Sequence, residues 1–371
     1  MTGIPMLEGR LESLRLYLHL TMRCNLSCSY CYGNARRGDT MPLQVARDAV
    51  DFFLPRARHL MLQFFGGEPL LQFGMLKEVV AYAEEQAGRQ GTPVSFVTVT
   101  NGTLLTAEVV DFLAAHRIDV SLSLDGGAAA QDAGRRFPDG RGSFAAVEAN
   151  LDRALSRLRS VHVVSVVTPD NVSRLAESVQ YLLGKGVRSI ALSVDYSDPR
   201  LPDVVPELER QLDAAAATYL ASLRQGKRTH VDLFDDSSNP YARGRCRLGE
   251  RDFSVDPTGR IYPCCCFVDR ESFPVGSIYG GIDPAEAAAL DEAVAELRRH
   301  IAQVHGDCPE GAFCRKGCGC TNVVATGSPS RVVPVTCTIS RAVARVQARL
   351  REARALTSPG PLPPPPAPAS S

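Results

Sequence analysis

Three cysteines near the start of the chain, Cys24, Cys28 and Cys31, have the spacing of an iron–sulfur site. Iron–sulfur clusters are normally anchored by four thiolates. Three thiolates on one short loop hold only three irons of a cubane, so the fourth iron stays open for a small molecule. This indicates an enzyme rather than an electron carrier. The alternatives are a zinc knuckle or three unrelated buried cysteines, but zinc sites favour paired C-x2-C spacings and no matching pair lies nearby.

The composition favours an ordinary enzyme with reduced thiols. The chain has 371 residues, 12 of them cysteines, and 41 Lys and Arg residues balance 41 Asp and Glu residues. No global field therefore attracts nucleic acid or a membrane surface, and we expect neither as a partner. No basic region followed by an apolar stretch opens the chain, and no apolar run is long enough to span a bilayer. We expect a cytoplasmic protein, in which cysteines serve metals rather than disulfides.

The elements that would position the first cysteines alternate between strands and helices. Apolar runs with strand character alternate with segments of helical period, a pattern typical of a parallel sheet with helical crossovers. The expected strands are 14–20, 60–64, 94–100, 118–124, 161–167 and 189–194. Right-handed crossovers would curl six such units into an α/β fold, a partial (β/α)6 barrel over residues 12–235. Chemistry in such barrels lies on loops at the carboxyl ends of strands, and the first cysteine loop follows the first strand.

The C-x3-C-x2-C spacing, with an aromatic residue before the last cysteine, resembles the radical S-adenosylmethionine (SAM) superfamily. In that family the methionyl amine and carboxylate of SAM chelate the open iron of a 4Fe-4S cluster. The loop after the second strand resembles the family's GGE motif, which binds the SAM amino group. Two glycines let a backbone approach a ligand closely, and a glutamate offers a carboxylate to an ammonium group. The resemblance implies a SAM-binding set of Tyr30, Gly66, Gly67 and Glu68.

Two later strand ends resemble the sulfatase-maturase-like branch of the family. Residues 100–105 read TNGTLL, and residues 123–126 read SLDG. The resemblance implies that Asn101 and Ser123 lie close to the ribose and methionyl group of SAM. The alternative is plain turn chemistry, because Asn-Gly and Asp-Gly form turns in any protein. Gln131 stands where this branch commonly has histidine, which suggests a different substrate contact.

The other nine cysteines lie between Cys246 and Cys337, and this clustering favours metal chemistry over packing. Their spacing over residues 243–340 resembles the SPASM extension of radical SAM enzymes, a small cysteine-rich domain with a β-hairpin and helices. The resemblance implies two auxiliary 4Fe-4S clusters. The nearer cluster would be held by Cys246, Cys264 and Cys318, and the outer cluster by Cys308, Cys314 and Cys337.

Each auxiliary cluster is then one ligand short of four. His305 stands where the pattern has a cysteine, and histidine can ligate iron, although a histidine at a helix end is more often a C-terminal cation. Cys265, Cys266 and Cys320 exceed the pattern. No cysteine lies between the first three and the SPASM segment, so one of these supplies the nearer cluster's fourth ligand, or that cluster has an open iron able to bind a substrate thiolate. The three could instead be inert core residues.

The resemblances imply an enzyme that generates a 5′-deoxyadenosyl radical from SAM, with electrons from a reductant such as flavodoxin or ferredoxin. The strongest resemblance is to peptide and protein maturases. Sulfatase maturases usually carry Asp after the Tyr-Pro-Cys cysteine, whereas Cys265 follows here. We therefore favour oxidative modification or cross-linking, for example by a thioether, of a ribosomally made peptide. The alternatives are an anaerobic sulfatase-maturating (formylglycine-generating) enzyme, a small-molecule SPASM enzyme of cofactor or haem biosynthesis, and a non-catalytic iron–sulfur electron-transfer protein.

Three expectations concern the ends of the chain. Too few residues precede the first strand for a leader-binding domain, so leader recognition would use a separate partner protein, the SPASM surface, or neither. Residues 341–356 are expected to form a C-terminal helix whose arginines lie on a solvated face. Residues 357–371 are rich in proline and are expected to be a disordered tail.

Overall fold

The computed structural model describes residues 9–33, 39–235, 248–268, 273–305 and 318–355. Within these ranges one sheet has the strand order β11-β10-β9-β8-β1-β2-β3-β4-β5-β6-β7. The pairs from β8 through β1 to β7 are parallel, and the pairs from β8 to β11 are antiparallel. The strands are β1 Leu14–Thr21, β2 Leu60–Gly66, β3 Val94–Thr100, β4 Asp119–Ser123, β5 Val161–Val167, β6 Ser189–Val194, β7 His230–Val231, β8 Asp252–Val255, β9 Arg260–Tyr262, β10 Gly276–Ser277 and β11 Gly281–Ile282.

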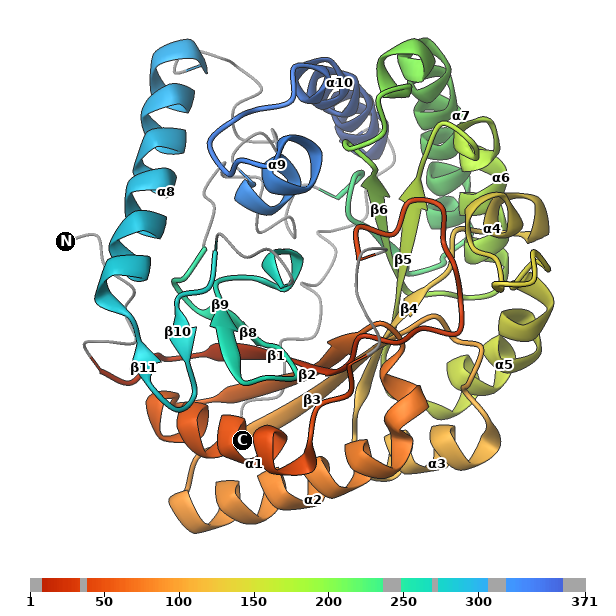
Figure 1. Ribbon diagram of the computed structural model, residues 1–371. Helices are drawn as coiled ribbons and strands as arrows, with labels where there is room; N and C mark the ends of the chain where they lie inside the picture. The colour runs from red at the N-terminus through yellow and green to blue at the C-terminus, as the bar shows by residue number, and fades with distance from the viewer. Residues whose placement is uncertain (1–8, 34–38, 236–247, 269–272, 306–317, 356–371) are drawn as a thin grey trace.

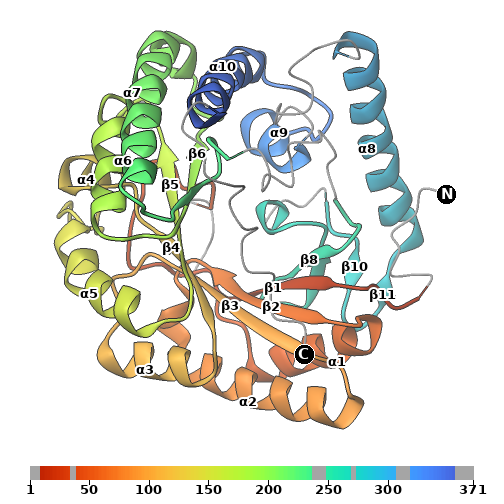
Figure 2. The ribbon, with the colours of Figure 1, turned by 180° about the vertical axis from the view of Figure 1, so that it is seen from behind.

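Figure 1 shows a row of helices along the outer side of the sheet, and further helices on its other side. The α-helices are α1 Leu43–Phe53, α2 Phe73–Gln90, α3 Ala107–Ala115, α4 Ala128–Gly134, α5 Phe144–Arg157, α6 Leu175–Gly184, α7 Val205–Arg224, α8 Pro284–His305, α9 Gly319–Thr326 and α10 Val335–Ala355. Short 3-10 turns are η2 Leu54–Arg56, η3 Pro69–Gln72, η4 Val172–Arg174, η5 Leu201–Val204 and η6 Cys265–Phe267. Both views place α9 between α8 and α10, on the opposite side of the sheet from α1 to α3 (Figures 1 and 2).

The predicted α/β barrel with six parallel strands is confirmed. Each observed strand from β1 to β6 overlaps its expected range, and neighbours along the chain pair in order. Residues of β1 are buried almost throughout, because a parallel strand between covered faces has no solvated side. Helix α1 presents Val50 and Phe53 to this core, and both are fully buried. The carboxyl ends of β1 to β6 therefore share one edge, where loop residues can meet.

The cysteine-rich segment begins with a hairpin that continues the sheet. Strand β8 pairs in parallel with β1, with Tyr17 opposite Ser254, and β9 then runs antiparallel to β8. Asp256 shapes the turn, since its Oδ1 accepts hydrogen bonds from the backbone N–H of Thr258 and of Arg260 at 2.8 and 3.0 Å. The hairpin was expected, but its attachment to β1 was not. The expected boundary near residue 243 lies outside the described residues.

The C-terminal helix α10 begins at Val335, before the expected residue 341. Its apolar side is buried, including Val346 and Leu350. Two of its arginines form ion pairs with α7, Arg345 with Glu209 and Arg349 with Asp213. Both arginines remain more than half exposed, so this face is solvated as expected, and α7 supplies acidic partners along it. The predicted tail, residues 357–371, lies outside the described residues.

No helix in the described part of the chain is both long enough and apolar enough to cross a bilayer.

Candidate functional site

The loop after β1 carries the three first cysteines together, as predicted. Cys24 and Cys31 are exposed and Cys28 is half-buried. Burial raises the pKa of the Cys28 thiol to about 11, although the nearby Arg135 guanidinium acts in the opposite direction. The loop backbone is held from the side by the end of α4, since Ser29 N–H donates to Gly134 O at 2.9 Å. Three thiols on an anchored, open loop can bind metal while leaving room for a second ligand.

The two glycines after β2 allow this loop to press against the loop after β1. A Cβ on Gly66 would lie 2.1 Å from Thr21 O, and a Cβ on Gly67 would lie 2.1 Å from Arg23 O. Gly67 N–H also donates to Thr21 O at 2.8 Å. The neighbouring atoms are backbone, so they cannot rotate away. Glycine is therefore required at both positions because two backbone segments approach closely. From the sequence, we expected the glycines to let the backbone approach a ligand.

Glu68 is fully buried and joins the loops after β2 and β3. Its Oε1 accepts hydrogen bonds from Leu70 N at 3.0 Å and Thr100 Oγ1 at 2.9 Å. Its Oε2 accepts a hydrogen bond from Asn101 N at 2.7 Å. Burial raises the pKa of Glu68 to about 7, against the lowering effect of these three donors. The carboxylate is thus fixed in position at the edge where the cysteine loop lies.

Asn101 lies beside the first cysteine. Its Nδ2 is 3.8 Å from Cys24 Sγ and donates to Asn25 Oδ1 at 2.8 Å. The structure therefore brings Cys24, Glu68 and Asn101 together from the loops after three successive strands. Ser123 is the last residue of β4, the strand next to β3, and pairs with Val164 of β5.

A buried polar network beneath the cysteine loop was missed by the sequence analysis. The Tyr30 hydroxyl donates a hydrogen bond to Asp125 Oδ2. Arg135 binds both oxygens of the same carboxylate and lies over the Tyr30 ring, 5.2 Å from its centroid. Burial raises the pKa of Tyr30 well above its usual value, so the phenol stays a donor. The sequence did contain a signal for this network, an Asp that follows an expected strand and an Arg ten residues later.

Gln131 belongs to this network rather than to a surface that touches substrate. It has no exposed area. Its Oε1 accepts from Asp125 N at 2.8 Å, and its Nε2 donates to Ser143 Oγ at 3.0 Å. The predicted substrate contact at this position is therefore wrong, because both ends of the amide are used inside the protein.

A cavity of about 470 Å³ opens beside the cysteine loop. Its walls come from the loops after β1, β5 and β6 and from α9. They are formed by Ser29, Tyr30, Cys31, Tyr32, Thr168, Asp170, Asp195, Ser197, Asp198, Pro199, Arg200 and Val324. Arg200 bridges Asp170 and Asp198 with contacts of 2.8 and 2.7 Å. Its hydrogen bonds hold the pKa of both carboxyls below the usual range.

These cavity residues were also missed, although a signal existed. Asp170 and Asp195 directly follow β5 and β6, where barrel loops commonly carry function. All of the lining residues except Val324 thus come from loops at the carboxyl ends of barrel strands, and Val324 brings in the cysteine-rich part. The position suits a substrate group held between the two cysteine-bearing segments.

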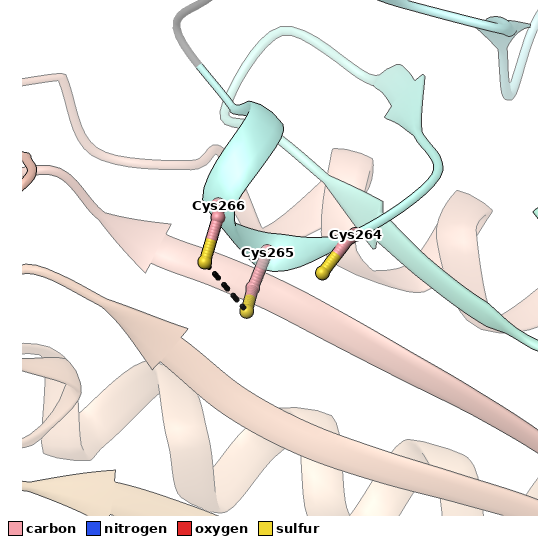
Figure 3. A group of neighbouring side chains, drawn as sticks. All are labelled: Cys264, Cys265 and Cys266. Atoms are coloured by element: carbon pink, nitrogen blue, oxygen red, sulfur yellow. Dashed lines mark hydrogen bonds between the residues drawn. The ribbon is translucent and has the colours of Figure 1, made fainter. Parts of the chain in front are cut away.

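A second group of thiols lies at the end of β9 and the start of α9. The Sγ atoms of Cys264, Cys265 and Cys266 all lie within 4.8 Å of one another (Figure 3). Cys320 Sγ lies 2.7 Å from Cys264 Sγ. Cys318 hydrogen-bonds to Cys320, and this contact lowers the pKa of Cys318 to about 6. The structure therefore gathers the predicted ligands Cys264 and Cys318 with all three surplus cysteines.

Other predicted ligands are not gathered there. Cys337 lies in the first turn of α10 and is not a member of the group formed around Cys264. Cys246, Cys308, Cys314 and the side chain of His305 lie outside the described residues. None of the nine described cysteines forms a disulfide. Both sets of free thiols have the donor chemistry that iron–sulfur clusters require.

Comparisons with known proteins agree with this geometry. Residues 18–182 match the model of the Radical SAM superfamily. An uncharacterized protein of Methanocaldococcus jannaschii is 31% identical over 185 residues, which cover 48% of this chain and 62% of that protein. A serine-type anaerobic sulfatase-maturating enzyme of Klebsiella aerogenes is 29% identical over 80% of this chain and 76% of the enzyme. The subtilosin biosynthesis protein AlbA of Bacillus subtilis is 24% identical over 72% of this chain and 57% of AlbA.

The chain thus spans less than two thirds of the length of some of these relatives, including the first. Among solved structures, native anSMEcpe with bound AdoMet and Cp18Cys peptide superposes with a TM-score of 0.78. The match covers 92% of this chain and all of that one, at 19% identity. At this identity the likeness shows a shared fold, including the part beyond the matched family model.

Proposed function

We propose that the chain, whose residues 18–182 match the Radical SAM superfamily and whose fold is shared with anSMEcpe, is a radical SAM/SPASM peptide maturase. In this proposal it oxidatively modifies or cross-links a ribosomally made peptide, for example by a thioether. A cytoplasmic location, two auxiliary clusters and a reductant such as flavodoxin or ferredoxin belong to the same proposal. A separate leader-binding protein remains one option for recognising the peptide.

Cys24, Cys28 and Cys31 would hold the first cluster. When bound, a reduced 4Fe-4S cluster and SAM supply a 5′-deoxyadenosyl radical able to abstract hydrogen from an unreactive carbon. The residues of this chain bind SAM and orient it. The buried Glu68 carboxylate and the Asn101 amide, fixed at adjacent loop ends, offer polar contacts to the methionyl amine and carboxylate of SAM. Ser123, at the end of β4, is proposed for the ribose side.

The shared cavity is the observation that carries the proposal. Cys31 and Tyr32 of the first cysteine loop line it together with Val324 of α9, the helix that carries Cys320. A side chain in this cavity would lie beside the first cluster and on the side of the second thiol group. An arrangement of this kind suits a reaction in which hydrogen is removed at one centre and an electron leaves by way of another.

Formylglycine formation is the second candidate. The shared fold with anSMEcpe, which was solved with a peptide, supports it. Against it, Cys265 follows the Tyr-Pro-Cys cysteine, and its thiol packs among other thiols instead of offering a carboxylate base. The AlbA likeness, to a bacteriocin biosynthesis protein, favours peptide maturation.

The first experiment measures SAM cleavage. Anaerobically reconstituted protein with dithionite should convert SAM to 5′-deoxyadenosine and methionine. The variant with Ala at Cys24, Cys28 and Cys31 should be inactive, since no described side chain nearby can replace three thiolates. Cleavage that survives in this triple variant would exclude the radical SAM mechanism at this site.

The second experiment identifies the product. Candidate precursor peptides encoded beside the gene are co-expressed with the protein and analysed by tandem mass spectrometry. Loss of two hydrogens with a new link between residues would support cross-linking. An aldehyde that reacts with a hydrazide probe would support the sulfatase-maturase candidate instead. Unmodified peptides, together with rapid SAM cleavage, would favour a small-molecule substrate.

A further inference from the structure

Four cysteines meet where the end of β9 and the turn η6 face the start of α9. The Sγ atoms of Cys264, Cys265 and Cys266 all lie within 4.8 Å of one another, and those of Cys265 and Cys266 are 4.0 Å apart. Cys320 Sγ lies 2.7 Å from Cys264 Sγ. Figure 3 shows the three sulfurs of the first group on the same side of η6. Thiols from two separate segments therefore lie together in one small volume.

This grouping favours metal binding over packing. All four cysteines are half-buried rather than fully buried, so a metal ion can reach them, and none of them forms a disulfide. A cysteine that serves packing behaves as a small apolar residue, and it gains nothing from facing other thiols. Thiolates, in contrast, are the ligands that bind zinc and iron.

The separations between the sulfurs fit one metal ion. A zinc–thiolate bond is about 2.3 Å long, so two thiolates on one tetrahedral ion lie roughly 3.8 Å apart. The 4.0 Å between Cys265 and Cys266 is close to this separation. In a 4Fe-4S cubane each thiolate binds a different iron, so its thiolates lie farther apart than on a single ion. Three sulfurs within 4.8 Å of one another therefore suit a single ion better than three corners of a cubane.

Cys320 supplies the fourth thiol. It is the second residue of α9, where the positive end of the helix dipole lies. A helix N-terminus lowers the pKa of a cysteine and so favours the thiolate that binds metal. Cys320 Sγ would move roughly 1 Å away from Cys264 Sγ for both sulfurs to bind one tetrahedral ion.

We propose that Cys264, Cys265, Cys266 and Cys320 bind one divalent metal ion in a tetrahedral four-thiolate site. Zinc and iron are the metals that such a set of sulfurs takes. An iron ion could accept one electron here, whereas a zinc ion would only hold η6 to α9. This changes the proposed function at one point, because Cys264 then binds a single ion instead of the nearer auxiliary cluster, and it leaves the radical SAM site unchanged.

The amounts of metal and sulfide test this without any activity. The background is the full chain with the first three cysteines replaced by Ala, reconstituted anaerobically with iron and sulfide, so that the first site contributes no metal. In that background Cys265→Ala and Cys266→Ala should each lose about one ion per chain, counted as iron plus zinc, and no inorganic sulfide, because a single-ion site contains none. Thr321→Ala is the matched control, since Thr321 is half-buried beside Cys320 in α9 and its replacement leaves every thiol in place.

Cobalt gives a second measurement where an alanine variant folds poorly. Before reconstitution, Co²⁺ alone should bind the background protein and give the thiolate-to-cobalt absorbance and the visible bands of a tetrahedral site. Cys265→Ser and Cys266→Ser keep the size of the side chain and should weaken these bands, while Thr321→Ala should not.

Three outcomes would overturn the inference. Loss of sulfide in proportion to iron in Cys264→Ala, Cys265→Ala or Cys266→Ala would assign these thiols to an iron–sulfur cluster. Unchanged metal content and an unchanged cobalt spectrum in the variants of Cys265 and Cys266 would exclude the four-thiolate site. A Cys264–Cys320 disulfide, found by mass spectrometry of the reconstituted protein, would exclude both as ligands. Failure of SAM cleavage in the wild-type protein, with the loss of one ion intact in the variants, would count against the proposed function alone.

Discussion

Arg135 and Asp125 form a two-point ion pair beneath the first cysteine loop, with Nε 3.1 Å from Oδ2 and Nη2 3.2 Å from Oδ1. The side chains are 8% and 0% exposed. The same carboxylate accepts hydrogen bonds from Tyr30 in the loop and from Val166 N in β5. The pair therefore ties the loop that bears the three cysteines to two strands of the barrel.

Replacing Asp125 by Asn should destabilise the fold by about 3–5 kcal/mol, because it leaves a buried guanidinium without its charge partner. The loop should also lose order, so the first cluster should be lost at a lower urea concentration. Urea unfolding followed by circular dichroism and by the visible absorbance of the cluster measures both. Asp139→Asn is the control, since its pair with Arg141 is solvent-exposed and should contribute little to stability. Equal effects of the two variants would contradict a special role for the buried pair.

Gly67→Ala should strongly reduce SAM binding and iron content. The added Cβ would lie 2.1 Å from Arg23 O, so the loops after β1 and β2 must separate. Iron analysis and equilibrium dialysis with labelled SAM would show the loss. Gly88→Ala is a matched control, because Gly88 is an exposed residue of α2 with open space at its Cβ position. That change should leave SAM binding intact and add about 0.5–1 kcal/mol of stability.

Asp235 should make the folding stability of the protein fall at acid pH. Burial alone would raise its pKa, but hydrogen bonds with His230, Arg354, Val231 N and Tyr219 lower it below the usual value. A carboxyl with a lowered folded-state pKa stabilises the protein above its unfolded pKa of about 3.9, and this contribution is lost as pH falls through the folded-state pKa. Urea unfolding of metal-free protein at neutral and at acid pH should show a smaller acid loss in Asp235→Asn. An unchanged acid loss would contradict this.

Apolar packing, rather than the exposed ion pairs, should hold α10 on α7. Leu350 is 4% exposed, so Leu350→Ala should cost about 2–5 kcal/mol. Glu209→Gln removes a partly exposed ion pair with Arg345 and should cost less than about 1 kcal/mol. Thermal unfolding of both variants measures the difference. A larger loss of stability for Glu209→Gln than for Leu350→Ala would mean that ion pairs, rather than apolar packing, hold α10 on α7.

Much of the barrel could be predicted from the sequence because its signals are local. A run such as 161–167 is rich in valine, and its residues alternate between buried and half-buried as expected for a strand. The signal of the cysteine loop was equally local, since its three cysteines lie within eight residues. The gathering of Cys264 with Cys320 could not be read from spacing, because it depends on where α9 docks.

Two other features depended on long-range contact. Asp125 follows β4 as part of an ordinary turn signal, and only the fold shows that Tyr30 and Arg135 both reach it. The parallel pairing of β8 with β1 joins strands more than 200 residues apart, roughly the length of a whole domain. No local propensity specifies such a pairing, because it is set by which sheet edge remains open.

The pairing of β8 with β1 also connects the two groups of cysteines through one strand. Tyr17 of β1 lies near Cys265 of the second thiol group, and Cys24 follows seven residues later on the same chain. Seven residues span at most roughly 25 Å even when fully extended. In the proposed function, this short covalent path would limit the distance that an electron travels between the two groups of cysteines.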